Sequence, residues 1–328
     1  MKILTFKPIR FLCACLLGAL AHFAAAQDYP SRPVKLVSPY ASGGANDILA
    51  RALAQKLSDL WNAQVLVENK PGASGILGTD FVRSAAPDGY TLELGTITTH
   101  VLNPILLPTA KYDGLKDFTP LAAIANSPFL LVVTPKINVK TTAELIALMK
   151  AQPGKLNFGS SGIGTSNHLA GELFKAMAGV DMVHVPYKGG TGSLMGLLQN
   201  EIQVQFDPLP STAVAQVKQG ALVALATTGK RRSRALPDLP TVAESGLPGY
   251  EAGAWYGVFA PAGLPRPVAQ KISADVLRAV ETSDAQAKLG ELGAESLALG
   301  APAFAEMIQR DRDVWTKLVR DRGIKIGN

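Results

Sequence analysis

Strand-like and helix-like segments alternate along most of this chain, and this alternation restricts the fold more than any other feature of the sequence. Short aliphatic and β-branched runs, such as 34–40 and 202–206, are each followed by a longer segment with helical spacing of apolar residues. Strands that are repeatedly followed by helices are typical of α/β proteins with largely parallel sheets, which we therefore predict. The predicted strands are 34–40, 64–68, 91–95, 121–125, 129–133, 156–159, 182–186, 202–206 and 222–227, and the predicted helices are 45–60, 75–84, 142–151, 165–178, 191–199, 211–219, 267–282 and 302–321.

Two passages rich in Pro and Gly, at 126–128 and 246–253, interrupt this alternation where the strand pattern restarts. Two such crossings predict that the first lobe contains both the N-terminal part and the final helices. We expect lobe 1 to comprise 27–126 plus 251–328, and lobe 2 to comprise 127–250. With 47% hydrophobic residues in the full chain, there is enough apolar material for substantial cores.

Residues 1–26 have the pattern of an export signal. Lys2, Lys7 and Arg10 precede the apolar run 11–23, which is followed by three alanines that end at Ala26. The apolar run is too short to span a bilayer. We therefore predict a signal peptide that is cleaved after Ala26 during export.

Removal of this segment limits the chemistry of the mature protein. Cys13 and Cys15 both lie inside it, so disulfides, cysteine catalysis and Cys-ligated metal are excluded. The formal charge of +6 falls to +3 when its three basic residues are lost, and so low a charge argues against a nucleic-acid binder. No later run is long and apolar enough for a membrane span.

Four loops made mostly of small residues each join a predicted strand to the following helix. Glycine leaves the backbone N–H groups open to a ligand, and a helix start carries unpaired donors and partial positive charge that suit an anion. In α/β sheets such loops lie at the carboxyl ends of the strands, where ligands bind. The alternative is a tight turn, with Asn46 or Asp47 as the helix cap in the first loop. The loops are "SPYASGGAND" (38–47), "NKPGASGILG" (69–78), "GSSGIGTSNH" (159–168) and "VPYKGGTGS" (185–193).

Basic residues are scarce in these loops. Lys188 and, at the edge of its turn, Lys70 are the basic residues of the last three. An anion would therefore meet mainly neutral N–H and hydroxyl donors, each contributing roughly 1.5–3 kcal/mol to a charged acceptor. Three or four such bonds support micromolar binding, about −8 kcal/mol. This suits a small carboxylate better than a pyrophosphate.

Enzyme motifs do not fit the chain. Gly-x-Ser-x-Gly, the complete dinucleotide fingerprint and the P-loop ending are missing, and His100, His168 and His184 do not have metal-ligand spacing. We expect no catalysis, no cofactor and no metal. We expect His184 to be packed; His168 is either a support of the site or part of a helix start, and Asp207 is either a turn cap or a polar group at the mouth of the cleft.

Taken together, the motifs resemble those of the Bug family of periplasmic solute receptors, the extracytoplasmic binding components of tripartite tricarboxylate transporters. The resemblance covers almost the whole mature chain. It rests on "YPSRPVKLVSPYASGGANDILAR", "VENKPGASGILGTDFV", "APDGYTL", "THVLNP", "FGSSGIGTSNHLAGELF", "VPYKGG", "LPDLPTVAESG" and "WYGVFAPAGLP".

The resemblance implies a two-lobed, type II periplasmic-binding-protein (Venus flytrap) fold, in which each lobe is a mixed sheet flanked by helices. In the family, the loops that match 40–47 and 160–165 grip a carboxylate from opposite lobes. Tyr40 and Ala41 depart from the Phe and Pro that are common there, which leaves the ligand open. The implied ligand-binding residues are Tyr40, Ser42, Gly43, Gly44, Asp47, Gly72, Ala73, Gly75, Thr96, Ser160, Ser161, Gly164, Thr165, His168, Tyr187 and Asp207.

The predicted function is capture of a small mono- or dicarboxylic acid in an interlobe cleft, for delivery to the permease subunits of a membrane transporter. We expect a periplasmic monomer that does not bind nucleic acid. One alternative is a receptor for an uncharged or aromatic solute such as an amide, and another is a sensory receptor that serves a signalling partner. An exported hydrolase is a third, for which no motif supplies a nucleophile and its base.

Overall fold

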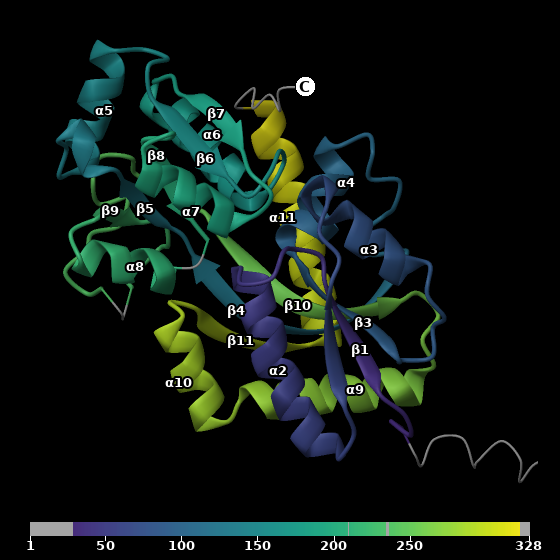
Figure 1. The fold of residues 1–328 in the computed structure, drawn as a ribbon. Helices are drawn as coiled ribbons and strands as arrows, with labels where there is room; N and C mark the ends of the chain where they lie inside the picture. Colours follow the sequence, from purple (N-terminus) through teal and green to yellow (C-terminus); the bar gives the residue numbers. More distant parts are fainter. Residues whose placement is uncertain (1–28, 209, 234–235, 322–328) are drawn as a thin grey trace, which may run out of the picture.

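A computed structural model describes residues 29–208, 210–233 and 236–321. The predicted signal peptide 1–26 lies outside the described residues. Two sheets form the centres of two lobes, with the teal and green elements of one above and to the left of the purple, blue and yellow elements of the other (Figure 1). We call the part built around the six-stranded sheet lobe 1 and the part built around the five-stranded sheet lobe 2.

Lobe 1 combines segments from both ends of the described chain. Its sheet has the order β11-β4-β10-β3-β1-β2, with β1 parallel to β2 and β3, and β10 antiparallel to β3 and β4. The strands are β1 (Val34–Ser38), β2 (Val65–Asn69), β3 (Thr91–Thr96), β4 (Phe118–Pro128), β10 (Gly253–Pro261) and β11 (Glu295–Gly300), and the helices are α2 (Ala45–Trp61), α3 (Ile76–Arg83), α4 (Asn103–Leu106), α9 (Arg266–Val280), α10 (Ser283–Glu291) and α11 (Ala301–Asp321), with the single turns η2 (Ala73–Gly75) and η3 (Thr98–Leu102).

Lobe 2 uses the middle of the chain. Its sheet has the order β7-β6-β8-β5-β9, with β6 parallel to β7 and β8, and β5 antiparallel to β8 and β9. The strands are β5 (Leu130–Val133), β6 (Asn157–Ser160), β7 (Val183–Pro186), β8 (Val204–Asp207) and β9 (Val223–Thr227), and the helices are α5 (Thr142–Ala151), α6 (Ser166–Ala178), α7 (Gly190–Gln199) and α8 (Pro210–Lys218), with the short turn η4 (Pro135–Ile137).

The mixed sheets implied by the family resemblance are confirmed, but the prediction of largely parallel sheets is wrong. The antiparallel strands are those beside the crossings between lobes. The chain leaves lobe 1 through β4, enters lobe 2 as β5 and returns to lobe 1 through β10, so the returning strand runs against its neighbours. The predicted boundary at 126/127 falls inside β4, and the one at 250/251 falls just before β10. The division at these residues stays a prediction.

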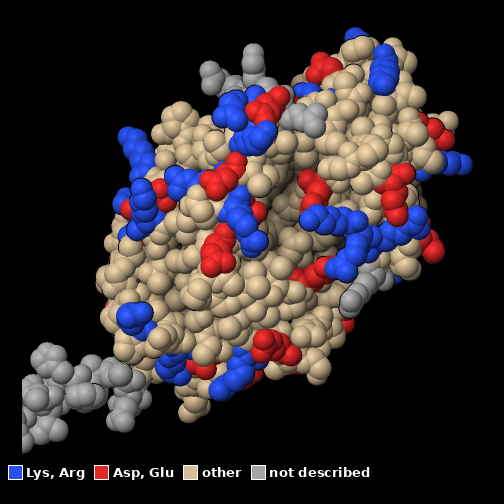
Figure 2. Space-filling model, turned by 180° about the vertical axis from the view of Figure 1, so that it is seen from behind, with Lys and Arg blue, Asp and Glu red and all other residues tan. Residues whose placement is uncertain are grey.

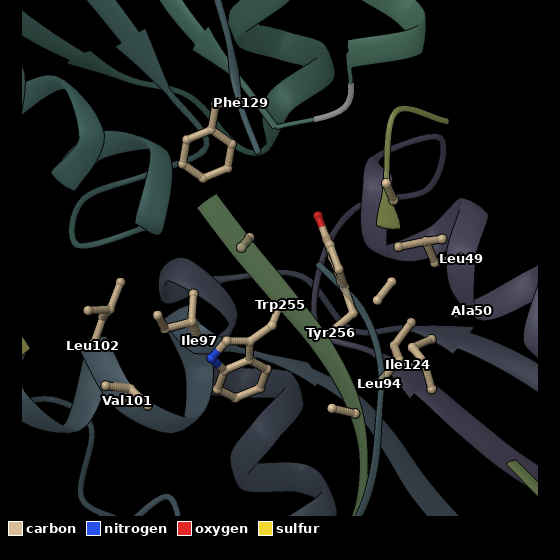
Figure 3. Packing of buried hydrophobic residues seen from close by; sticks show 14 of the residues in the cluster. Leu49, Ala50, Leu94, Ile97, Val101, Leu102, Ile124, Phe129, Trp255 and Tyr256 are labelled. Carbon is tan, nitrogen blue, oxygen red and sulfur yellow. The ribbon is translucent and has the colours of Figure 1, made fainter. Parts of the chain in front are cut away.

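All the predicted strands and helices are present with small shifts at their ends, whereas β10, β11, α10 and the 98–106 segment were not predicted. The strand β10 is buried along almost its whole length, so it shows none of the alternation that marks a half-buried strand. Its side chains pack on both faces of the sheet (Figure 3). There Trp255 lies among Ile97 and Leu102, while the Tyr256 hydroxyl points toward lobe 2.

One large cluster of buried apolar side chains runs through both lobes, and a smaller one lies under α7 and α8. The apolar residues at helical spacing in the last predicted helix pack into the core. In α11, Phe304, Ile308 and Trp315 are buried, and Leu318 and Val319 pack partly buried against the same cluster.

Charged side chains of both signs are interspersed on the face seen from behind (Figure 2). In the basic run 230–232, Arg232 lies 3.0 Å from Glu244, and Lys230 lies 3.5 Å from Glu251. The side chains of both pairs are exposed to solvent. Within the described ranges, no helix is long and apolar enough to cross a membrane, and no group of three or more His, Cys, Asp and Glu is arranged to hold a metal ion.

Candidate ligand-binding site

A cavity of ≈130 Å³ lies between the two lobes. It receives residues from the strand ends and helix starts of both. Lobe 1 contributes Tyr40, Ala41, Gly43, Gly44, Ala45, Asn46, Thr96, Thr98, Ala254 and Tyr256, and lobe 2 contributes Ser161, Thr165, Ser166, Asn167, Lys188, Gly189, Gly190, Thr191, Leu194, Asp207 and Pro208.

Three helices begin at this cavity, namely α2, α6 and α7. Their cap residues are Gly44, Thr165 and Gly189, and none of these caps makes a side-chain hydrogen bond to its helix. A helix start without a side-chain cap leaves N–H donors for another acceptor. The three positive helix ends, each equivalent to about half an elementary charge, therefore meet at one place.

Asp47 fixes the conformation of the first loop through hydrogen bonds. The Gly43 N–H donates to Asp47 Oδ2 at 2.9 Å, and Asn69 Nδ2 donates to Asp47 Oδ1 at 2.9 Å. Arg51 Nε donates to Oδ2 at 3.1 Å. Burial by itself raises the pKa of Asp47, but the hydrogen bonds from Arg51, Gly43 and Asn69 outweigh it and lower the pKa below its ordinary value. The carboxylate stays ionised and shapes the loop.

The third loop is held by its own side chains. The Gly162 N–H donates to Ser160 Oγ at 3.1 Å, and the Gly164 N–H donates to His168 Nδ1 at 3.0 Å. The Ser161 N–H donates to Asn167 Oδ1 at 3.3 Å. These bonds orient the turn that leads into α6.

Two histidines support this loop from behind. The rings of His168 and His184 stack with centroids 3.7 Å apart, and His184 Nε2 lies 2.6 Å from Ser160 Oγ. Burial, together with neighbouring His184 and Lys175, lowers the pKa of His168 to about 3. Burial and Lys175 lower the pKa of His184 to about 4. Both rings are therefore neutral at ordinary pH, and His168 Nδ1 can accept the Gly164 N–H.

Aromatic side chains form the lobe 1 wall of the cavity. The hydroxyls of Tyr40 and Thr96 lie 3.1 Å apart. Burial raises the pKa of Tyr40 to about 12, although its hydrogen bond with Thr96 works in the other direction. Burial also raises the pKa of Tyr256. Both phenols therefore stay protonated and can donate.

The lobes contact each other around the cavity. Ser74 Oγ donates to Ile163 O at 2.5 Å, and the Ser166 N–H donates to Thr98 Oγ1 at 3.0 Å. Thr191 Oγ1 donates to Gly43 O at 3.4 Å. Two of these contacts join glycine-rich loops of opposite lobes, and the third joins Thr98 to the start of α6, so the structure represents a closed arrangement.

Comparison with known proteins identifies the family. The model of the family described as "Tripartite tricarboxylate transporter family receptor" matches residues 49–324. The chain belongs to this family. The predicted resemblance to Bug-type receptors is thereby confirmed, and the family is one of receptors rather than of enzymes.

Individual relatives agree with this assignment. The chain is 31% identical to Protein BugT of Bordetella pertussis over 310 residues, which cover 94% of this chain and 95% of BugT. Rpa4515 of R. palustris, solved with adipate, is 35% identical with a TM-score of 0.88, over 91% of this chain and 99% of that one. MatC of Rhodopseudomonas palustris, solved with malate, is 32% identical with a TM-score of 0.83, over 89% and 100%. The fold is the two-lobed periplasmic-binding-protein fold.

Seven of the predicted ligand-binding residues of this receptor line the cavity. Asp207 is one of them; its side chain is buried at the end of β8. As ligand contacts, all of these residues stay predictions. They are Tyr40, Gly43, Gly44, Thr96, Ser161, Thr165 and Asp207.

The other predicted residues lie outside the cavity lining. Ser42 is exposed, and Tyr187 turns away, because its hydroxyl donates to Glu201 Oε2 at 3.0 Å. Gly72, Ala73 and Gly75 belong to the turn that presents Ser74 to lobe 2. Asp47, Ser160, Gly164 and His168 build the loops from within, through the hydrogen bonds described above.

Several lining residues were not predicted from sequence. The fourth glycine-rich loop was recognised, but its contribution is the start of α7, with Gly189, Gly190 and Thr191, rather than Tyr187. Asn46 was considered only as a helix cap. Tyr256 comes from the unpredicted strand β10, and no local pattern distinguishes it from a core aromatic.

Proposed function

We propose that this receptor captures a small carboxylate in the interlobe cavity and delivers it to the membrane permease of a tripartite transporter. The observation that carries this proposal is the meeting of three helix starts without side-chain caps at one cavity. Donors and positive helix ends from both lobes favour an anion there.

The charged side chains of the lining do not account for such binding by themselves. Lys188 is exposed, whereas Asp207 is buried. Backbone dipoles and hydroxyl groups therefore supply the attraction for a negative ligand, as the scarcity of basic residues in the glycine-rich loops also suggests. A negative ligand gains from these dipoles what an uncharged amide does not. Two structural relatives were solved with carboxylates, adipate and malate, which supports the same class of ligand.

The mechanism is capture without covalent chemistry. A ligand that contacts the helix starts of both lobes stabilises the closed form over the open form. The closed surface then differs from the open one, which allows a permease to distinguish the loaded receptor. We also propose a monomer, export to the periplasm with cleavage after Ala26, and the lobe boundaries given above.

The test is titration calorimetry on the mature chain from Gln27, with mono- and dicarboxylates and the amide of each acid as the matched control. We expect at least one carboxylate to bind in the micromolar range, about −8 kcal/mol, and its amide to bind at least ten-fold more weakly. The absence of binding by every carboxylate, or equal binding by an acid and its amide, would overturn the proposal.

A further inference from the structure

Two buried amides in the cavity lining each have one polar atom without a hydrogen-bond partner among the described residues. They are Asn46, which is 3% exposed, and Asn167, which is 1% exposed. The atoms concerned are Asn46 Oδ1 and Asn167 Nδ2. Asn46 lies in the first turn of α2 in lobe 1, and Asn167 lies in the first turn of α6 in lobe 2, so the two amides approach the cavity from opposite sides.

In each amide the second polar atom makes hydrogen bonds, and these bonds show which of the two atoms is the oxygen and which is the nitrogen. Asn46 Nδ2 donates to Leu94 O at 2.7 Å. A flipped amide would place oxygen against that carbonyl oxygen. Asn167 Oδ1 accepts from the Ser161 N–H at 3.3 Å and lies 2.8 Å from Thr165 Oγ1. A flip there would bring the amide NH₂ group against the Ser161 N–H donor. Asn46 therefore has an acceptor left over, and Asn167 has a donor.

A buried polar atom without a partner costs roughly 1–3 kcal/mol. Such atoms are few in folded proteins and need a physical reason when they occur. In a receptor whose ligand lies between these two helix starts, the reason is that the ligand supplies the missing partners. A carboxylate alone only accepts, so it can satisfy Asn167 but cannot satisfy Asn46.

We propose that Asn46 and Asn167 select a ligand that carries, besides its carboxylate, a hydroxyl group, so that the substrate class is the hydroxycarboxylic acids. This rests on the proposed function of the same cavity. A hydroxyl donates one hydrogen bond and accepts others, which an ammonium or a keto oxygen does not.

The test compares acids that share one carbon skeleton. Calorimetry at pH 7.5 is carried out with propionate, lactate, pyruvate and alanine, with succinate, malate, oxaloacetate and aspartate, and with malonamate as a carboxamide probe. We expect the hydroxy acid of at least one set to bind about ten-fold more tightly than the plain acid, since the plain acid leaves Asn46 Oδ1 unpaired.

Variants assign the preference to the two amides. Asn46→Ala removes the acceptor, and Asn167→Ala removes the donor. Each is expected to reduce the ratio of hydroxy-acid to plain-acid affinity to two-fold or less. Asn103→Ala is the matched control, because Asn103 is equally buried and its Oδ1 also has no partner, but it lies outside the cavity lining. It should leave the ratio unchanged.

The outcomes separate this inference from the proposed function. Binding of plain acids without a hydroxy preference, or a preference for the oxo, amino or carboxamide compound, overturns the inference and leaves carboxylate capture intact. A hydroxy preference that survives both Asn variants also overturns it. If no acid of any set binds, the proposed function itself fails.

Discussion

Asp47 illustrates how a single side chain can prepare a binding loop without contacting the ligand. Its carboxylate accepts from the Gly43 N–H, from Arg51 and from Asn69, and its side chain is only 4% exposed. The Gly43 N–H, which the sequence suggested would be open to an anion, is therefore already bonded within the loop. The N–H donors that remain available to a ligand are those at the start of α2, after Gly43.

Replacing Asp47 by Ala is expected to lower the free energy of unfolding by about 2 kcal/mol, because several hydrogen bonds to one buried carboxylate are lost together. Ligand affinity should fall as well, since the loop loses its brace. Urea denaturation and calorimetry measure the two effects. Asp59→Ala is the control, because Asp59 accepts one exposed bond from Gln55; an equal loss in both variants would contradict the role of Asp47.

The stacked histidines make stability depend on pH. Their folded-state pKa values, about 3 for His168 and about 4 for His184, lie below the ordinary value of roughly 6.5. Below that pH the unfolded chain binds protons that the folded chain does not, so stability falls as the pH drops from 6.5 toward 4. Each histidine contributes at most about 2 kcal/mol of loss between pH 6.5 and 5.

Denaturant unfolding at pH 7, 6 and 5 measures this loss. His168→Gln keeps an acceptor for the Gly164 N–H but removes one titrating ring, and it should reduce the pH slope by about half. A variant with the slope of the wild type would show that other groups are responsible.

At the scale of elements, the turn between β2 and α3 is built from backbone conformations that side chains rarely adopt. Gly72, Ala73, Ser74 and Gly75 all have positive φ, at 138°, 46°, 55° and 92°. Non-glycine residues in this region cost of order 1–3 kcal/mol each. This strained backbone places Ser74 within hydrogen-bond distance of Ile163 O in lobe 2. The turn therefore contributes a contact between the lobes and does not line the cavity.

Gly75→Ala should lower the free energy of unfolding by about 2 kcal/mol or more, because a Cβ there lies 2.8 Å from Thr99 Cγ2 and the φ is unfavourable. Gly43→Ala is the matched comparison. Its φ is also positive, at +77°, but nothing lies within 4 Å of the added Cβ, so about 1 kcal/mol is expected. Thermal and urea unfolding of both variants test which one loses more stability. A greater loss of stability for Gly43→Ala than for Gly75→Ala would contradict this prediction.

At the scale of the whole molecule, closure depends on a few hydrogen bonds between lobes. Ser74 donates to Ile163 O, and Thr98 accepts from the start of α6. These bonds exist only when the lobes are together, so their loss shifts the equilibrium toward the open form, and apparent affinity falls with the closed fraction.

The double variant Ser74→Ala, Thr98→Val is expected to bind the ligand roughly three- to ten-fold more weakly and to show a larger radius of gyration by solution scattering without ligand. Ser273→Ala is the control, because this serine also donates to a carbonyl, that of Leu121, but within lobe 1. Unchanged scattering together with unchanged affinity would show that these bonds do not govern closure.

The sequence by itself determined the elements, the α/β class, the glycine-rich loops and the family. These features follow from local spacing: the apolar period that buries Phe304 and Ile308 along α11 is present in any ten-residue window of that helix. A helix start rich in small residues is also a local pattern in the sequence. For this reason, three of the four loops recognised from sequence do lead into helices that begin at the cavity.

Only the tertiary structure decided which of these groups meet. The direction of β10, the meeting of α2, α6 and α7, and the pairing of Asp47 with Gly43 depend on sheet register and on the approach of the two lobes. Contacts between residues far apart in the chain set both of these. For this reason Tyr256 and the two unpaired amides became visible only in the fold, whereas Tyr187, in a correctly recognised loop, turned out to face Glu201.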